Sequence, residues 1–454
     1  MRNLAVALVL GAGVILSSVV ASAQAKGQLD DIATYRREVL AVDPAFTPTA
    51  RRAAERGLRA LEARAAAGRL SDTVLGVRLC QLTALADNGH SNCVLETLGD
   101  PQVPVFIYPL ADGLFVISAD QANADLLGAR FLGVDGHPAA EVTRAARGMA
   151  GGETGYRDVT TAGLYGRPAL LHALGLARRP AAATYRFALT DGRKIIRELN
   201  AGAPGSPAKG PPSAWAFQDN AKRFRWADAP AHDALIVQVR RNEDGPDVSL
   251  ARFLSEVENH RAELGRRNVV FDLRSDNGGN VLLSRDAMLA WPKSIGHDGR
   301  FMVLIGPRTF SAGMATAAYL KQAGGRRVIF VGQPPGDRMI NFAENHMTKM
   351  PHSGLIISVA TARDDFAGGC KAYKDCFAGI AQPGAPTGSP PELEQTVARV
   401  PLQVPSLGPD IPASLRVADW RAGRDPAMAA ALKAFEPCRD AAACATERMA
   451  LAGT

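Results

Sequence analysis

Between residues 232 and 332, short apolar runs alternate with segments of helical periodicity. The runs are rich in Val, Ile, Leu and Phe, which is typical of buried strands. Strands that alternate with helices predict an α/β layer built on a largely parallel sheet. The expected strands are 232–239, 268–274, 301–306 and 327–332, and the expected helices are 247–264 and 311–322.

The chain before this layer follows other patterns. Apolar residues at a spacing of three to four predict helices over 51–85, whereas β-branched and aromatic residues predominate from Val103 onward. A strand-turn-strand-helix unit is expected over 124–146 and a hairpin over 184–198. Gly, Pro and Ala fill 201–212, which indicates a linker.

These patterns divide the 454 residues into six parts, and a chain of this length is expected to hold two or three domains. The parts are a signal peptide (1–25), an N-terminal helical region that carries His90 (26–100), a β-rich module (101–200), a linker (201–230), an α/β core (231–395) and a C-terminal segment (396–454).

The N-terminus has the features of an export signal. Arg2 precedes an uncharged apolar stretch, Leu4–Val20, and small residues at 21–25 offer a cleavage site. We therefore predict a periplasmic or secreted protein with no stable membrane insertion after signal removal. The alternative is an uncleaved anchor, because the apolar stretch is close to the shortest that spans a bilayer.

The six cysteines fit an oxidising compartment. They lack the CxxC spacing of a zinc site, so disulfides between near neighbours are expected, although spacing alone does not fix the connectivity. The expected pairs are Cys80 with Cys93, Cys370 with Cys376, and Cys438 with Cys444.

The net charge of +7 does not indicate a nucleic-acid partner. Arginines are scattered along the chain rather than gathered in one stripe, and only 6% of the residues are aromatic. We expect ordinary surface charge and no nucleic-acid binding.

Two segments of the core could support acyl transfer. The strand at 268–274 runs into a polar turn with Gly278 and Gly279, whose backbone N–H groups can point outward. Ser311 starts the helix that follows the next strand, so its hydroxyl and nearby N–H groups could serve as nucleophile and oxyanion donors. A serine at this place is also a common helix N-cap.

A general base is expected in a turn near the N-terminus. His90 lies in the polar segment 84–93, next to Cys93, and histidine is the commonest base at neutral pH. A lone loop histidine is more often inert surface. His346 and His352 follow the last core strand and remain rivals.

Together these segments resemble the catalytic domain of the tail-specific (C-terminal-processing) serine protease superfamily, in its tricorn-core and retinoid-binding-protein-like branch. The resemblance covers most of the chain after the signal. It is carried by DNGHS (87–91), DLRSDNGG (272–279), TFSAGM (309–314), VGQPP (331–335) and the closing segment 407–432.

The resemblance implies an α/β fold with a crotonase-like catalytic core, a sheet with flanking helices. An N-terminal helical region and a small β-rich module, PDZ-like or substrate-guiding, would accompany the core. It assigns Ser311 as the nucleophile and the N–H groups of Ala312 and of Gly278 or Gly279 as oxyanion donors. No cofactor is implied.

Two kinds of catalytic base occur in this superfamily, a lysine and a histidine. The stretch that would carry the lysine has none, and Lys321 is about three helical turns beyond Ser311, too far to reach it. The histidine version matches His90. The resemblance makes Glu344 the acidic residue that orients it, with Asp337 as the alternative.

The predicted function is an exported serine peptidase that hydrolyses peptide or protein substrates through an acyl-enzyme. Two departures from the family pattern stand against it. First, Asp276 replaces the usual Asn, and its negative charge could weaken an oxyanion hole. Second, Gln-Pro-Pro at residues 333–335 replaces the usual Glu-Pro-Thr. The alternatives are a catalytically inactive ligand- or peptide-binding protein on the same fold, and an esterase. The oligomeric state is not predicted.

Overall fold

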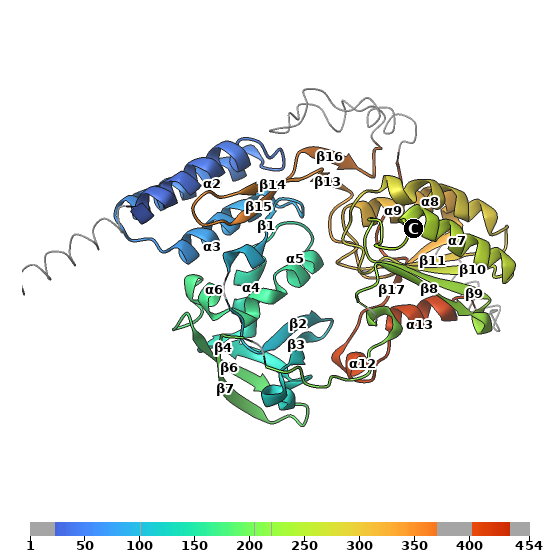
Figure 1. The fold of residues 1–454 in the computed structure, drawn as a ribbon, viewed down its shortest axis with the longest axis horizontal. Coiled ribbons are helices and arrows are strands. Elements are labelled where there is room, and N and C mark those ends of the chain that lie inside the picture. The colour runs from blue at the N-terminus through green and yellow to red at the C-terminus, as the bar shows by residue number, and fades with distance from the viewer. Residues whose placement is uncertain (1–22, 100, 204, 219, 370–401, 436–454) are drawn as a thin grey trace, which may run out of the picture.

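The computed structural model describes residues 23–99, 101–203, 205–218, 220–369 and 402–435. The predicted signal peptide, apart from its last three residues, and Cys370, Cys376, Cys438 and Cys444 lie outside these residues. The described part is mixed α/β and holds four sheets. In Figure 1 a lobe with the N-terminal helices and an antiparallel sheet faces a second lobe that contains a largely parallel sheet.

The six-stranded sheet of the second lobe contains the four strands that the sequence predicted. Its order is β17-β12-β11-β10-β9-β8, and all neighbours are parallel except the edge pair β8 and β9. The strands are β8 (Phe224–Ala229), β9 (Ala234–Val239), β10 (Asn268–Asp272), β11 (Phe301–Ile305), β12 (Val328–Gly332) and β17 (Ile411–Pro412).

Helices cover both faces of this sheet, which explains why its inner strands β9 to β12 are mostly apolar. Along β10, Val269 and Phe271 pack into one buried cluster, with α7, α8 and α9, whereas Val270 packs into another, with α13. The helices are α7 (Leu250–Glu263), α8 (Leu282–Ser294), α9 (Ala312–Gly324) and α13 (Pro426–Lys433). The sequence did not predict α8, which contains Pro292 in its last turn.

The first lobe contains a sheet of order β2-β3-β4-β6-β7, antiparallel throughout, with β5 paired to β4. Both the unit predicted over 124–146 and the hairpin over 184–198 are confirmed. The strands are β2 (Val105–Leu110), β3 (Gly113–Ala119), β4 (Arg130–Val134), β5 (His137–Pro138), β6 (Ala182–Ala188) and β7 (Lys194–Asn200), beside α4 (Ala139–Arg147), α5 (Thr154–Thr160) and α6 (Pro168–Ala173).

The N-terminal region is helical as far as residue 86 and then changes. Helical residues 23–34 continue into η1 (Tyr35–Leu40), followed by α2 (Pro48–Ala66), α3 (Asp72–Thr83) and η2 (Ala84–Ala86). The region expected to be helical up to residue 100 then contains a short strand, β1 (Asn92–Cys93), and a 3-10 turn, η3 (Leu95–Leu98). None of the described helices is both long and apolar enough to cross a membrane.

A small sheet joins this region to residues that follow β12. Its order is β1-β15-β14, with β14 (His346–Lys349) and β15 (Ile356–Val359), and Asn92 lies opposite Ser358. A two-stranded ribbon, β13 (Ile340–Ala343) with β16 (Ala362–Asp365), lies beside it in Figure 1. The predicted Cys80–Cys93 disulfide is present and ties α3 to β1, with the two Cα atoms 5.5 Å apart. The remaining short elements are η4 (Gln121–Leu126), η5 (Ala162–Gly166), η6 (Trp215–Phe217), η7 (Pro230–His232), η8 (Gly325–Arg327) and α12 (Val417–Arg421).

Candidate active site

Ser311 lies at the junction between the loop after β11 and the first residue of α9. Its backbone has φ 52° and ψ −125°, a conformation that residues with a Cβ rarely adopt and that costs roughly 1–3 kcal/mol. An N-cap serine normally accepts a hydrogen bond from the first turn of its helix, but the Ser311 side chain makes no such bond. The helix-cap explanation of this serine therefore does not hold.

The loop before Ser311 is fixed by hydrogen bonds from three directions. The hydroxyl of Thr309 donates to the carbonyl of Leu273 at 2.9 Å and accepts from the N–H of Gly306 at 2.9 Å. The N–H of Phe310 donates to the carbonyl of Asp276 at 3.0 Å. These bonds fix the loop against the end of β10 and so maintain the unfavourable backbone conformation of Ser311.

Gly278 packs directly against Ser311. A Cβ at Gly278, where φ is 102°, would lie 2.7 Å from the Ser311 Cβ and 3.2 Å from its Oγ, so no other residue fits. The N–H of Gly278 donates to Asp276 Oδ1 at 3.1 Å, whereas the described residues offer no acceptor for the N–H of Gly279 or Ala312. Two of the three predicted oxyanion donors are thus unengaged.

Asp276 lies underneath this turn and is completely buried. Its Oδ2 accepts from Asn242 Nδ2 at 2.7 Å, and Asn242 Oδ1 accepts from the Ser284 hydroxyl at 2.7 Å. Burial raises the pKa of Asp276 to about 8. The Asp276 carboxyl is therefore mostly neutral at pH 7. Because Asp276 replaces the Asn of the family pattern, a negative charge is expected at this position, and at pH 7 that charge is largely absent.

His90 is buried beside the loop that carries Ser311, with 3% of its surface exposed. Its ring stacks on Phe310 with centroids 4.2 Å apart, and the ring of Tyr156 also stacks on Phe310, with centroids 4.4 Å apart. Neither ring nitrogen of His90 has a hydrogen-bond partner among the described residues. The structure thus brings His90 against the residue next to Ser311, without a hydrogen bond between the two predicted catalytic side chains.

The carboxylate nearest to this ring belongs to Asp337. Its Oδ2 lies 3.9 Å from His90 Nδ1 and accepts from the N–H of Gly89 at 2.8 Å. Glu344, the predicted orienting residue, is exposed, has a positive φ of 48°, and makes no ion pair with His90 in the described structure. The sequence suggested Glu344 and Asp337 as residues that could orient His90. Of these two, Asp337 is the one whose carboxylate lies close to the His90 ring.

A third acidic residue, Asp364 on β16, completes the surroundings of His90. Burial raises its pKa to about 7, and the nearby negative charges of Glu344 and Asp337 add to that rise, whereas His90 opposes it. Neither Asp364 nor the stacked Tyr156 lies in a recognisable motif, so the sequence alone does not indicate that they lie near His90. Their positions follow from the strand pairing of β13 with β16 and from the packing of α5.

The other side chains considered as the catalytic base are His352, Lys321 and His346. The first two contact other residues, and the third has no described hydrogen-bond partner. His352 Nε2 lies 3.2 Å from Asp72 Oδ1, and its backbone N–H donates to Asp31. Lys321 donates to the Val328 carbonyl at 2.7 Å. His346 is on β14, where burial lowers its pKa and neither ring nitrogen has a described partner. Within the described ranges, no three His, Cys, Asp or Glu side chains are grouped so that they could hold a metal ion.

Neither a protein-family model nor a curated protein sequence matches this chain. Among solved structures, mature CPAF complexed with lactacystin matches with a TM-score of 0.57 at 10% identity, over 91% of this chain and 98% of that chain. This chain has the fold of mature CPAF. A second structure of mature CPAF gives the same TM-score at 11% identity, over 91% and 97% of the two chains.

The photosystem II D1 C-terminal processing protease also matches, with a TM-score of 0.36 at 12% identity over 89% of this chain and 98% of that chain. This likeness is weak and carries no structural inference. The resemblance to tail-specific proteases that the sequence indicated is confirmed at the level of the fold.

Proposed function

We propose that this protein is an exported serine peptidase that hydrolyses peptide bonds through an acyl-enzyme, with Ser311 as the nucleophile. The observation that carries the proposal is the backbone of Ser311, which is held in an unfavourable conformation with its hydroxyl unused by the helix. Strain of this kind persists only where the surrounding structure imposes it, and it is concentrated at functional sites. The CPAF-like fold supports the same interpretation.

In the proposed reaction, His90 accepts the proton of the Ser311 hydroxyl as the oxygen attacks the substrate carbonyl. The N–H groups of Ala312 and Gly279 stabilise the oxyanion, while Gly278 keeps the approach to Ser311 open. His90 then donates the proton to the leaving amine, and water hydrolyses the acyl-enzyme. Asp337 stabilises the protonated ring, with Glu344 as the alternative orienting residue.

This mechanism requires His90 to reach Ser311, because no hydrogen bond joins them before substrate binds. Catalytic hydrogen bonds are often long or absent in free enzymes and form in the substrate complex. A movement of the His90 ring along Phe310 is therefore part of the proposal. The peptide would bind in the cleft between a crotonase-like core and the β-rich residues 101–200, which we assign as a PDZ-like or substrate-guiding module.

The second candidate is a catalytically inactive peptide- or ligand-binding protein on the same fold. One observation favours it: both ring nitrogens of His90 lack partners in the described structure, and the ring is stacked against Phe310. If that arrangement were permanent, Ser311 would have no base. An esterase that uses the same residues is a further form of the catalytic hypothesis.

A fluorophosphonate probe separates these functions, because it labels only serines with an activated hydroxyl. The protein from residue 26 onward, with its disulfides intact, would be labelled and the adduct mapped. Labelling at Ser311 that Ser311→Ala and His90→Ala both abolish is expected, while Ser275→Ala, on the neighbouring loop, keeps it. A folded protein that is not labelled but binds peptides would be the inactive binder. Ester and peptide substrates then distinguish esterase from peptidase.

A further inference from the structure

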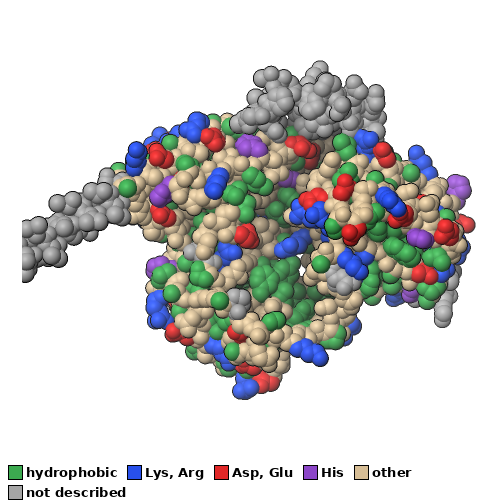
Figure 2. Space-filling model, viewed as in Figure 1, with side chains coloured by type: hydrophobic (Ala, Val, Ile, Leu, Met, Phe, Trp, Pro, Cys, Tyr) green, Lys and Arg blue, Asp and Glu red, His purple; other side chains and the backbone are tan. Residues whose placement is uncertain are grey.

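A cleft of about 1140 Å³ lies against the two loops that form the candidate site. Its walls include Ser275 and Asn277 from the turn after β10, and residues 305–308, which run from the last residue of β11 into the following loop. The opposite wall is formed by residues of β2, β3, α4 and α5. Figure 2 shows the molecule hollowed at the centre of this face, with hydrophobic side chains inside the hollow and Lys or Arg side chains beside it.

The charged side chains of this cleft are mostly positive. Six arginines and two aspartates line it, and no lysine, glutamate or histidine does so among the described residues. The arginines are Arg147, Arg240, Arg241, Arg274, Arg308 and Arg424. Positive charge in a cleft attracts negatively charged ligands, so what each arginine contributes depends on whether it is already paired within the protein.

Five of these arginines already have partners in the protein. Arg147 pairs with Asp158, Arg241 with Glu243, Arg274 with Asp272 and Asp425, Arg424 with Asp419, and Arg240 donates to Asn220 and to the Gln218 carbonyl. Arg308 differs, since none of the described residues forms an ion pair or hydrogen bond with its side chain. It is exposed in the cleft, where its donors can meet a ligand.

Arg308 is also the arginine closest in sequence to the proposed nucleophile, three residues before Ser311 on the same fixed loop. Neighbouring Pro307 packs on Gly155 of α5, 3.0 Å from where a Cβ would lie, so the loop cannot shift freely. An extended peptide advances about 3.3–3.6 Å per residue. A group paired with Arg308 would therefore lie within a few residues of the bond held at Ser311.

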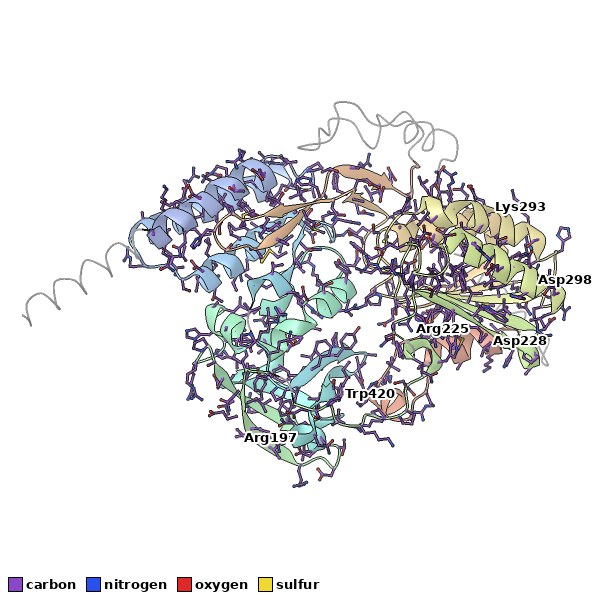
Figure 3. All side chains as sticks on the ribbon, in the orientation of Figure 1. Arg197, Arg225, Asp228, Lys293, Asp298 and Trp420 are labelled. Carbon is purple, nitrogen blue, oxygen red and sulfur yellow. A yellow bond between two sulfur atoms is a disulfide. The ribbon has the colours of Figure 1, made fainter. Side chains whose placement is uncertain are left out.

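We propose that Arg308 selects substrates that carry an aspartate or glutamate side chain within a few residues of the scissile bond. The inference rests on the proposed function and names its substrate class. Arginine suits the role because its planar group binds a carboxylate through two parallel hydrogen bonds. The rest of the cleft offers apolar contacts to neighbouring side chains, from Tyr108, Leu114 and Trp420. Trp420 belongs to α12 and is labelled in Figure 3.

Binding tests the proposal without requiring catalysis. Fluorescein-labelled decapeptides with amidated C-termini would be titrated by anisotropy against the Ser311→Ala protein. One peptide series moves a single Asp along a Gly/Ser/Leu background, and a matched series carries Asn at the same positions. At one or two adjacent positions, Asp is expected to bind about 3- to 10-fold more tightly than Asn, and Arg308→Gln should abolish that difference.

The matched control is Arg424→Gln, which removes the same charge from an arginine already paired with Asp419. It should keep the Asp preference, and Arg308→Lys should keep part of it. Equal binding of Asp and Asn peptides at every position would overturn the proposal. A preference that appears only with a free C-terminal carboxylate would overturn the side-chain assignment.

A failure of the proposed peptidase function would give different experimental results from a failure of the Arg308 proposal. A protein that fluorophosphonate does not label, yet discriminates Asp from Asn through Arg308, would be a binder with the proposed selectivity. A protein whose Ser311 is labelled, and which cleaves Asp and Asn peptides at equal rates in both the parent and the Arg308→Gln forms, would be a peptidase without it.

Discussion

The ring of His90 stacks on the ring of Phe310, with centroids 4.2 Å apart, and this contact holds the proposed base beside the proposed nucleophile without joining them. Stacked rings attract each other by about 0.5–1.5 kcal/mol beyond the burial of their surfaces. His90 must give up part of that attraction to turn toward Ser311. In the proposed mechanism, this contact therefore contributes both to the stability of the site and to the free energy needed to turn His90 toward Ser311.

Replacing Phe310 with Leu should release His90. We expect Ser311 to be labelled up to roughly tenfold faster, because about 1.4 kcal/mol of stacking no longer opposes the movement. The free energy of unfolding should fall by about 1–2 kcal/mol, since a buried ring is replaced by a smaller side chain. Labelling rates and urea unfolding measure the two effects. Tyr156→Phe, which keeps its ring on Phe310, is the control; unchanged labelling in Phe310→Leu would contradict the prediction.

Replacing Gly278 with Ala should abolish activity. The added Cβ would lie 2.7 Å from the Ser311 Cβ, so Ser311 or the turn must move, and a misplacement of about 1 Å can cost roughly 100-fold in rate. The control is Gly136→Ala, where φ is 98° but nothing lies within 4 Å of the added atom. Both variants share the backbone strain, and only Gly278→Ala should lose probe labelling. Equal losses in the two variants would mean that the contact with Ser311 is unimportant.

Asp276 predicts that stability depends on pH. Burial raises its pKa from 3.8 to about 8, so the folded state binds a proton that the unfolded chain releases. This contribution is complete below about pH 4 and is lost as the pH rises to about 8, at no more than about 1.4 kcal/mol per pH unit. Asp276→Asn should flatten that part of the profile, measured by urea unfolding at about pH 5, 7 and 9.

The Asp276→Asn variant can keep the buried network if the amide of Asn242 turns over. The Asn242 oxygen would then accept from the amide introduced at position 276, and the Asn242 nitrogen would donate to the Ser284 hydroxyl, which in the parent protein donates to Asn242. Asp286→Asn changes an exposed carboxylate and should leave the profile as it is. A profile identical in the parent and Asp276→Asn proteins would show that this carboxyl does not titrate across the range.

The two candidate orienting residues can be separated by substitution. Asp337→Asn should slow labelling of Ser311 by roughly 10- to 1000-fold, because the imidazolium loses its nearest carboxylate, whereas Glu344→Gln should change it only a few-fold. The measurement is the labelling rate from about pH 5 to 9, with circular dichroism to check folding. A larger effect of Glu344→Gln would restore the residue that the family resemblance indicated.

The strands and helices of the core could be predicted because each carries its own signal. The apolar runs at β9 to β12 are buried on both faces, and their spacing leaves room for one helix between most pairs. The sequence did not predict α8, and Pro292, a residue that disfavours helix, lies in its last turn. Ser311 and the turn at Gly278 were found because both belong to motifs close in sequence.

The surroundings of His90 could not be predicted in the same way. The positions of Asp337, Asp364 and Phe310 around the ring depend on the pairing of β1 with β15 and of β13 with β16, between strands that share no sequence pattern. The choice between Asp337 and Glu344 needs a knowledge of loop conformation to within a few ångströms. Periodicity and composition contain no such information.

The pairing of Asn92 with Ser358 also fixes when the site comes into existence. A ribosome has made His90 long before it makes the strand that holds it, and the two are separated by more than half of the chain. No unfinished chain that ends before β15 can assemble this site. The reaction proposed for Ser311 and His90 can therefore begin only after β15 has been synthesised.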